Sequence, residues 1–148
     1  MAAPAYFGTA GFRRIPPDSV AVIFPLPSER LPQASLWQST TGMRFKLPGG
    51  YFLVPSAAGT MTYSPQLLIG QISLTALVFA ALAAGTSPPR TPDAQRALLG
   101  QLRAWHVESV VAFPEGTANP AEVISYLTWL IGRPPLPRSG AFAWYGRI

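Results

Sequence analysis

The chain has 148 residues, of which 49% are hydrophobic and 11% are charged, and its formal net charge is +5. Its length is typical of one domain, and its apolar content excludes a disordered chain because enough surface can be buried to offset the entropy lost on folding. The absence of cysteine excludes disulfides, thiolate metal sites and a cysteine nucleophile. The eleven basic residues are scattered rather than clustered, so we do not expect nucleic acid as a partner.

The N-terminal third contains one clear strand and one short helix. Residues 1–17 lack the basic and apolar regions of a secretory signal, and we expect them to form an extended segment before the first strand. Residues 19–25 (SVAVIFP) are a continuous apolar run rich in β-branched side chains, which predicts a central strand covered on both faces. Residues 33–41 predict a short helix that ends at Gly42.

Residues 37–55 carry the densest set of candidate ligand-binding side chains. Residues 43–47 alternate apolar and basic side chains, as a half-exposed strand does, and a Pro-Gly-Gly turn leads to a second short strand at 51–54. Aromatic faces stack on sugar rings and Arg binds phosphate bidentately, so this region is a candidate contact for a sugar or a phosphate. The candidates are Trp37, Arg44, Lys46, Gly49, Gly50 and Tyr51. The alternative is that the two aromatic residues belong to the core and the two cations are solvated.

Residues 67–85 are uncharged and long enough to cross a bilayer. Polar residues interrupt the run, and no aromatic belt flanks it, so we favour a buried helix over a membrane span. The residues expected on the inner side of that helix are Leu67, Leu68, Leu74, Val78 and Leu82.

Two helix start signals mark the second half of the chain. Residues 91–93 combine a Thr N-cap, a Pro at the first helical position and an Asp in the first turn. Asn119 and Pro120 start the next helix, with Glu122 as its capping-box acid and Gly132 at its end.

Two further strands complete the prediction, at residues 107–114 and 141–147. The resulting order is β-α-β-β-α-α-β-α-β. It predicts a single α/β domain over residues 1–148, a layered sandwich with a small mixed sheet.

Few side chains in this sequence are suited to catalysis. His106 is the single histidine, and its place at the end of a helix predicts a cap for the last carbonyls; we expect no metal site and no cofactor. Glu29 and Glu115 each follow a predicted central strand, and ligands of open α/β sheets bind at that edge. These two acids are therefore the acid/base candidates if the chain is an enzyme.

The order of several motifs resembles a known family. A Pro-Pro-Asp-Ser-Val strand ends in Pro-x-Pro and is followed by Leu-Trp-Gln and Gly-Met-Arg-Phe-Lys-Leu-Pro-Gly-Gly-Tyr, with Val-x-Ser-Val-Val and Leu-x-Gly-Arg-Pro-Pro further on. Over residues 4–148 this order resembles the C-terminal, non-membrane region of actinobacterial multi-pass membrane glycosyltransferase-like proteins, which use polyprenyl-phosphate sugar donors. In such transferases the catalytic acid lies in an early extracytoplasmic loop between membrane helices, so the resemblance implies no catalytic residue for this chain.

Three functions are open at this point. The resemblance implies a non-catalytic accessory domain on the extracytoplasmic side of the cell membrane. Its partner would be the membrane part of a transferase or the membrane surface, and its ligand a glycan or polyprenyl phosphate. One alternative is a small soluble α/β enzyme in the cytoplasm with a strand-end site at Glu29 and Glu115. The other is a purely structural, partner-binding domain with an exposed apolar patch along residues 67–82.

Overall fold

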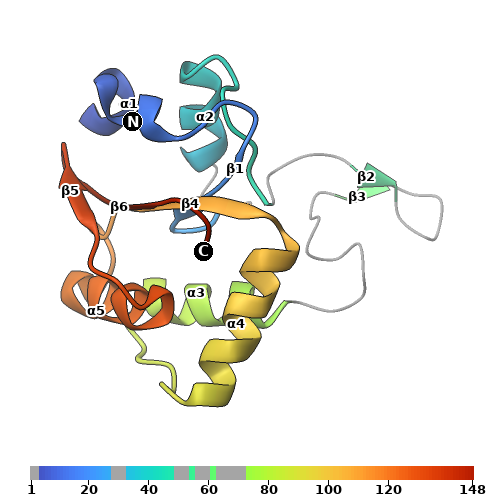
Figure 1. Ribbon diagram of the computed structural model, residues 1–148, viewed down its shortest axis with the longest axis vertical. Helices are drawn as coiled ribbons and strands as arrows, with labels where there is room; N and C mark the ends of the chain where they lie inside the picture. Colours follow the sequence, from blue (N-terminus) through green and yellow to red (C-terminus); the bar gives the residue numbers. More distant parts are fainter. Residues whose placement is uncertain (1–3, 28–32, 49–53, 56–60, 63–72) are drawn as a thin grey trace.

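The fold is built on a four-stranded sheet with helices on both faces (Figure 1). The computed structural model describes residues 4–27, 33–48, 54–55, 61–62 and 73–148. The strands of the sheet, in spatial order, are β1 (Val20–Phe24), β4 (Val107–Ala112), β6 (Ala141–Tyr145) and β5 (Leu136–Arg138). β1 and β4 are parallel, whereas the β4–β6 and β6–β5 pairs are antiparallel. This small mixed sheet confirms the predicted α/β class.

Two strands differ from their prediction. The sequence predicts β1 as a central strand, but it lies at one end of the sheet. Among the described residues, its outer side is covered by Lys46, which donates its N–H to Ser19 O and accepts from Ala21 N, both at 2.8 Å. The strand β5 has no counterpart in the prediction because it is short, exposed and contains Pro137, which are features of a loop or of an edge strand.

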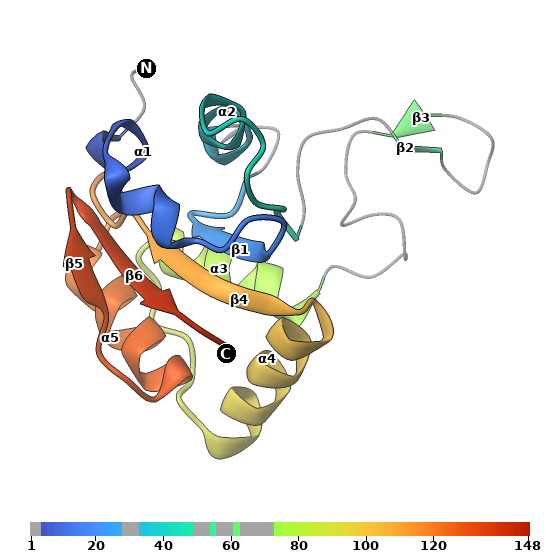
Figure 2. The same cartoon turned by 45° about the horizontal axis from the view of Figure 1, so that its top comes forward.

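Three helices pack on one face of the sheet, namely α3 (Leu74–Ala83), α4 (Pro92–Ala104) and α5 (Pro120–Ile131) (Figure 2). Their inward side chains and those of the sheet form the larger core cluster. Its fully buried members include Phe79, Leu98, Leu102, Leu127 and Trp144. Burial of such side chains contributes about 1.5–3 kcal/mol each, so this cluster is the main source of stability on this face.

The opposite face is covered by α1 (Ala5–Gly8), the 3-10 helix η1 (Ala10–Arg14) and α2 (Gln33–Thr40). The expectation that residues 1–17 are extended is therefore wrong for residues 5–14. Tyr6 and Phe7 explain the difference, because both are buried against the sheet, and the Tyr6 hydroxyl lies 2.9 Å from that of Tyr145 on β6. A segment so short becomes helical through these tertiary contacts rather than through its own propensity.

The strand predicted at residues 43–47 does not form. Phe45 is buried under α1 and α2, and Lys46 makes a single bridge to Val20, without a continuous ladder. A separate two-stranded sheet pairs β2 (Val54–Pro55) with β3 (Met61–Thr62). The predicted second strand at 51–54 meets β2 only at its last residue, and its first three residues lie outside the described part of the chain.

The predicted helix starts at Thr91 and Asn119 and the predicted helix end at Gly132 are confirmed. Thr91 Oγ1 accepts from Ala94 N at 3.2 Å, and Asn119 Oδ1 accepts from Glu122 N at 3.2 Å. Gly132 ends α5 with φ of +78°, in the left-handed region that glycine tolerates best. These contacts are local, which is why short sequence signals predict them correctly.

α3 forms within the predicted 67–85 helix, although residues 67–72 lie outside the described part of the chain. Leu82 is buried as predicted, whereas Leu74 is 48% exposed, because Thr75, Ala76 and Phe79 form the inner side instead. Among the described residues, no helix has both the length and the apolar character needed to cross a membrane.

The Glu122 side chain contacts residues beyond its own helix start. Its carboxylate accepts two hydrogen bonds from Arg90 Nη2 at 2.8 Å and one from the Ser87 hydroxyl. The Arg90 guanidinium also lies over the Tyr126 ring, 5.5 Å from its centroid. The side chain of Glu122 thus ties the loop before α4 to α5, and does not return to the N–H of Asn119. These contacts, the Ser87 hydrogen bond foremost and then Arg90, lower the pKa of Glu122.

We therefore expect Glu122→Gln to lower the free energy of unfolding by about 0.5–1 kcal/mol at about pH 7, the range of a well-placed surface ion pair. Because the pKa of Glu122 is lowered by folding, its contribution is present above the unfolded pKa and is lost as the pH falls through the folded pKa. The difference between the two proteins should consequently shrink in acid, as measured by urea unfolding across pH. Asp93→Asn, which removes an exposed ion pair with Arg96, is the matched control and should change little.

Candidate functional site

The carboxyl ends of the two parallel strands meet at one edge of the sheet. Phe24 and Ala112 are paired there, and Phe113 N donates to Phe24 O at 3.0 Å. After β1 the chain continues to α2 on one face, whereas after β4 it continues to α5 on the opposite face (Figure 2). Neighbouring parallel strands whose connections diverge in this way leave a crevice between them, and open α/β sheets bind ligands at such a point.

A pocket of about 240 Å³ lies at this edge, and we call it the strand-end pocket. Five of its described lining residues are apolar. The apolar members are Pro25, Ala34, Trp37, Ala83 and Phe113, and the others are Gln33, Glu115, Gly116 and Thr117. Apolar walls with a few polar groups are characteristic of small-molecule sites.

Trp37 is a wall of this pocket and also part of the core. It is 8% exposed, and its ring centroid lies 5.5 Å from that of Phe7 and 5.0 Å from that of Phe113. The core alternative for Trp37 is therefore confirmed. Its Nε1–H is buried and has no hydrogen-bond partner among the described residues, which is unusual because buried indole N–H groups are normally paired.

Glu115 stands on a turn whose backbone is fixed. Both the N–H and the hydroxyl of Thr117 donate to Pro114 O, at 3.0 and 2.6 Å, and Gly116 adopts φ of +89°. The Glu115 side chain is exposed beside the pocket. Its predicted companion, Glu29, lies outside the described residues, so the distance between the two acids is not defined.

Arg44 and Lys46, the other described candidates of the 37–55 region, do not line the strand-end pocket. The Arg44 guanidinium donates to Ile15 O at 3.2 Å through Nε and to Arg13 O at 3.4 Å through Nη2, so it holds the end of η1. Lys46 is exposed and bonds β1 through its main chain. The remaining candidates, Gly49, Gly50 and Tyr51, lie outside the described part of the chain. A ligand-binding role for these residues stays a prediction.

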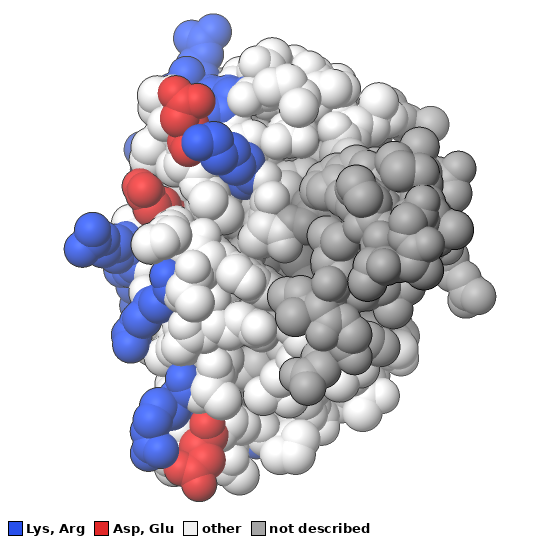
Figure 3. Space-filling model, turned by 90° about the vertical axis from the view of Figure 1, so that its right-hand side faces the viewer, with Lys and Arg blue, Asp and Glu red and all other residues white. Residues whose placement is uncertain are grey.

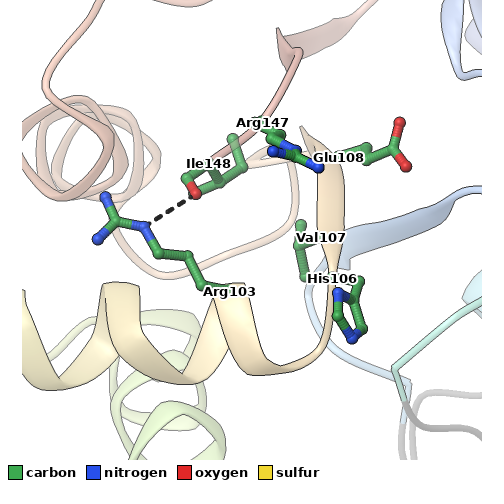
Figure 4. Close-up of a pocket in the computed structure, with 6 residues that line it drawn as sticks. All are labelled: Arg103, His106, Val107, Glu108, Arg147 and Ile148. Atoms are coloured by element: carbon green, nitrogen blue, oxygen red, sulfur yellow. Dashed lines mark hydrogen bonds between the residues drawn. The ribbon is translucent and has the colours of Figure 1, made fainter.

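A second hollow, of about 610 Å³, lies at the opposite edge of the sheet, where α4 ends and β4 begins (Figure 4). Arg103, His106, Glu108 and Arg147 line it, but Arg103 Nε donates to the main-chain oxygen of Ile148 at 3.2 Å. In Figure 4 the guanidinium of Arg103 points away from His106 and Arg147. The guanidinium groups of Arg103 and Arg147 therefore do not converge on one point, as a bound anion would require.

His106 ends α4 differently from its prediction. Its main-chain N–H donates to Arg103 O at 2.9 Å, and its φ is +56°. The imidazole is exposed and makes none of the side-chain hydrogen bonds found among the described residues. The backbone rather than the imidazole closes this helix end.

Charge is spread over the described surface. Figure 3 shows basic side chains spaced along one margin of the molecule, with acidic side chains between them, and no single basic patch on the described part of that face. The described residues also contain no group of three His, Asp or Glu side chains placed to hold a metal ion. The strand-end pocket is thus the site that the fold itself points to.

The sequence indicated the edge, Glu115 and Trp37 but not the rest of the pocket. Gln33, Phe113 and Thr117 carry no motif, and the position of each just after a strand or at a helix start is the one signal that could have indicated them. Comparisons with protein-family models, with curated proteins and with solved structures found no match.

Proposed function

We propose that the chain is a non-catalytic accessory domain that binds a ligand in the strand-end pocket. The observation that carries this proposal is the position of the pocket, at the point where the connections of β1 and β4 diverge. Binding is favoured over catalysis because the described lining holds a single carboxylate, Glu115, and no second titratable group. General acid–base chemistry on a substrate normally uses two such groups.

The motif order described above supports placing this domain in a membrane glycosyltransferase-like protein, on the extracytoplasmic side. Its ligand would then be a glycan or a polyprenyl phosphate. The enzyme alternative makes a different prediction. If a turnover activity were found and were lost in Glu29→Gln with Glu115→Gln, the accessory proposal would be wrong.

Filling the pocket tests the proposal without knowledge of the ligand. Ala83 lines the pocket from α3, and Ala83→Leu places three additional carbons in it. Small-molecule fragments that bind the wild-type chain, detected by saturation-transfer NMR, should bind this variant at least about tenfold more weakly.

Ala84→Leu is the matched control, because Ala84 is the adjacent, exposed residue at the end of α3 and does not line the pocket. Fragment binding that is equal in the two variants would show that the pocket is not the binding site. The absence of any fragment binding would have the same consequence.

A second observation favours seating of this domain on a membrane surface. α3 contains no charged residue, yet Leu74 and Leu77 are 48% and 52% exposed, and Ala80 and Ala84 are exposed on the same side. The outer side of a surface helix is normally polar. An apolar outer side together with a net charge of +5 matches an anionic lipid surface, where hydrophobic and electrostatic attraction act together.

The chain should therefore sediment with vesicles of phosphatidylglycerol and phosphatidylcholine. Leu74→Ser with Leu77→Ser should reduce the vesicle affinity by about tenfold or more, because half-exposed leucines would no longer be buried in lipid. Leu36→Ser with Met43→Ser is the control, since these exposed apolar residues belong to the opposite layer. A wild-type chain that ignores the vesicles, or equal losses in both double variants, would contradict this role.

A further inference from the structure

The walls of the strand-end pocket suit the flat apolar faces of a ring. Trp37 and Phe113 meet there edge to face, with ring centroids 5.0 Å apart and an interplanar angle of 61°. Pro25, Ala34 and Ala83 complete the apolar lining. Aromatic and aliphatic walls of this kind pack against the C–H surfaces of small cyclic molecules.

The polar groups of the pocket are complementary to a ligand that both donates and accepts hydrogen bonds. The Glu115 carboxylate accepts, and the Gln33 amide does both. The indole Nε1–H of Trp37 is buried, so it is not one of these groups, and it has no hydrogen-bond partner among the described residues. No Lys, Arg or His side chain is among the described lining residues.

Three ligand chemistries can be compared against these groups. A phosphate or a carboxylate offers acceptors alone and would place its negative charge near Glu115 without a described cation to balance it. An ammonium group offers donors alone and cannot accept a hydrogen bond from the Gln33 amide. A hydroxyl group donates and accepts, so a ring with several hydroxyls can pair with both the Glu115 carboxylate and the Gln33 amide.

We infer that the strand-end pocket binds one neutral, hydroxylated ring, a monosaccharide unit, and not a phosphate. This inference rests on the proposed binding function and narrows its ligand from glycan or lipid phosphate to the sugar. The volume of about 240 Å³ equals that of roughly eight waters at about 30 Å³ each, which is room for a single ring rather than an oligosaccharide. The pocket would then hold one unit of a glycan, with the rest of the chain outside.

Titrations with small probes followed by NMR test the inference. The probes are the methyl glycosides of glucose, galactose, mannose and arabinose, with inorganic phosphate and cyclohexanol for comparison. The indole N–H resonance of Trp37, identified by its absence from the Trp37→Phe variant, reports on the pocket. At least one glycoside should shift this resonance saturably, whereas phosphate should not, and cyclohexanol should bind at least about fivefold more weakly because it has a single hydroxyl.

Matched acid variants show whether the carboxylate takes part. Glu115→Gln should weaken glycoside binding by about fivefold, the loss expected for a charged hydrogen-bond acceptor at a partly exposed site. Glu108→Gln, at the opposite edge of the sheet, should leave it unchanged. Ala83→Leu should abolish the shift.

Each failure has a distinct meaning. A response to phosphate without a response to any glycoside would overturn the sugar assignment and leave the binding function in place. Binding of cyclohexanol as tight as that of the glycosides would do the same, because the polar groups would then be irrelevant. Fragment binding that Ala83→Leu blocks, combined with silence from every glycoside, would likewise refute the sugar while the pocket stands. Silence from fragments and glycosides together would refute both proposals.

Discussion

Trp37→Ala is expected to lower the free energy of unfolding by about 3–5 kcal/mol, the loss typical of a large aromatic side chain removed from a core. Trp37 is 8% exposed and packs between Phe7 and Phe113, on the face of the sheet that α1 and α2 cover. Removal of the Trp37 side chain leaves a cavity, and the rings of Phe7 and Phe113 cannot fill it without losing contact with each other. Urea unfolding followed by circular dichroism measures the loss.

Trp37→Phe is the informative companion of this variant. Phenylalanine keeps most of the ring contacts and removes the indole N–H, which has no partner in the part of the chain that the structure describes. Leaving such a buried donor unpaired costs about 1–3 kcal/mol, so its removal offsets part of the lost packing. We expect less than half the destabilisation of Trp37→Ala. Equal losses in the two variants would mean that the indole N–H is paired in solution, and unchanged stability in both would mean that Trp37 is not a core residue.

Gly85→Ala is the second change with a large expected effect, roughly 2–4 kcal/mol of destabilisation. Gly85 follows α3 with φ of +86°, its N–H donates to Leu82 O at 3.0 Å, and Thr86 N donates to Ala81 O at 2.9 Å. This pattern is a Schellman ending, which requires the left-handed conformation at the glycine. A β-carbon there would also lie 2.7 Å from that of Ala118, so steric overlap adds to backbone strain.

Gly42→Ala separates these two causes. Gly42 has φ of +67°, but a β-carbon at this position would have no neighbour within 4 Å among the described residues. Only the backbone strain remains, and the expected loss is roughly 1–2 kcal/mol. Thermal unfolding of both variants should show the larger decrease for Gly85→Ala. Equal decreases would indicate that the contact with Ala118 relaxes at little cost.

Trp37→Ala and Gly85→Ala also bear on function, because Trp37 lines the strand-end pocket and Gly85 follows the helix that supplies Ala83 to it. A loss of ligand binding in either variant would therefore combine altered stability with an altered pocket. Ala83→Leu and Glu115→Gln are better probes of binding, since Glu115 is exposed and Ala83 is only partly buried.

Much of the secondary structure could be predicted because its signals are local. Thr91, Asn119 and Gly132 act within one helical turn of their own position, through caps and a left-handed ending. The β-branched runs that became β1 and β4 are mainly apolar, with Glu108 and Ser109 as the polar residues of β4, as expected for strands covered on both faces. The class of the fold and the edge where its parallel strands end follow from these elements.

The hydrogen-bond partners of the candidate side chains could not be predicted in the same way, since these partners lie far away in the chain. Arg44 is a ligand-binding candidate from its sequence, and its guanidinium bonds the main chain of Ile15, 29 positions away. The sequence predicts Glu122 as a capping-box acid, but its carboxylate bonds Arg90, 32 positions away. A long polar side chain can reach several partners, and only the packing of the elements selects one.

By itself, then, the sequence determined the helices with strong caps, the two apolar strands and the α/β class, because each depends on residues close together in the chain. The tertiary structure decided that β1 lies at the end of the sheet, that residues 5–8 and 10–14 are helical, and that Trp37 and Glu115 line one pocket. Those outcomes depend on which distant segments meet. The free energy that decides them comes from burial and long-range hydrogen bonds, which no short stretch of sequence contains.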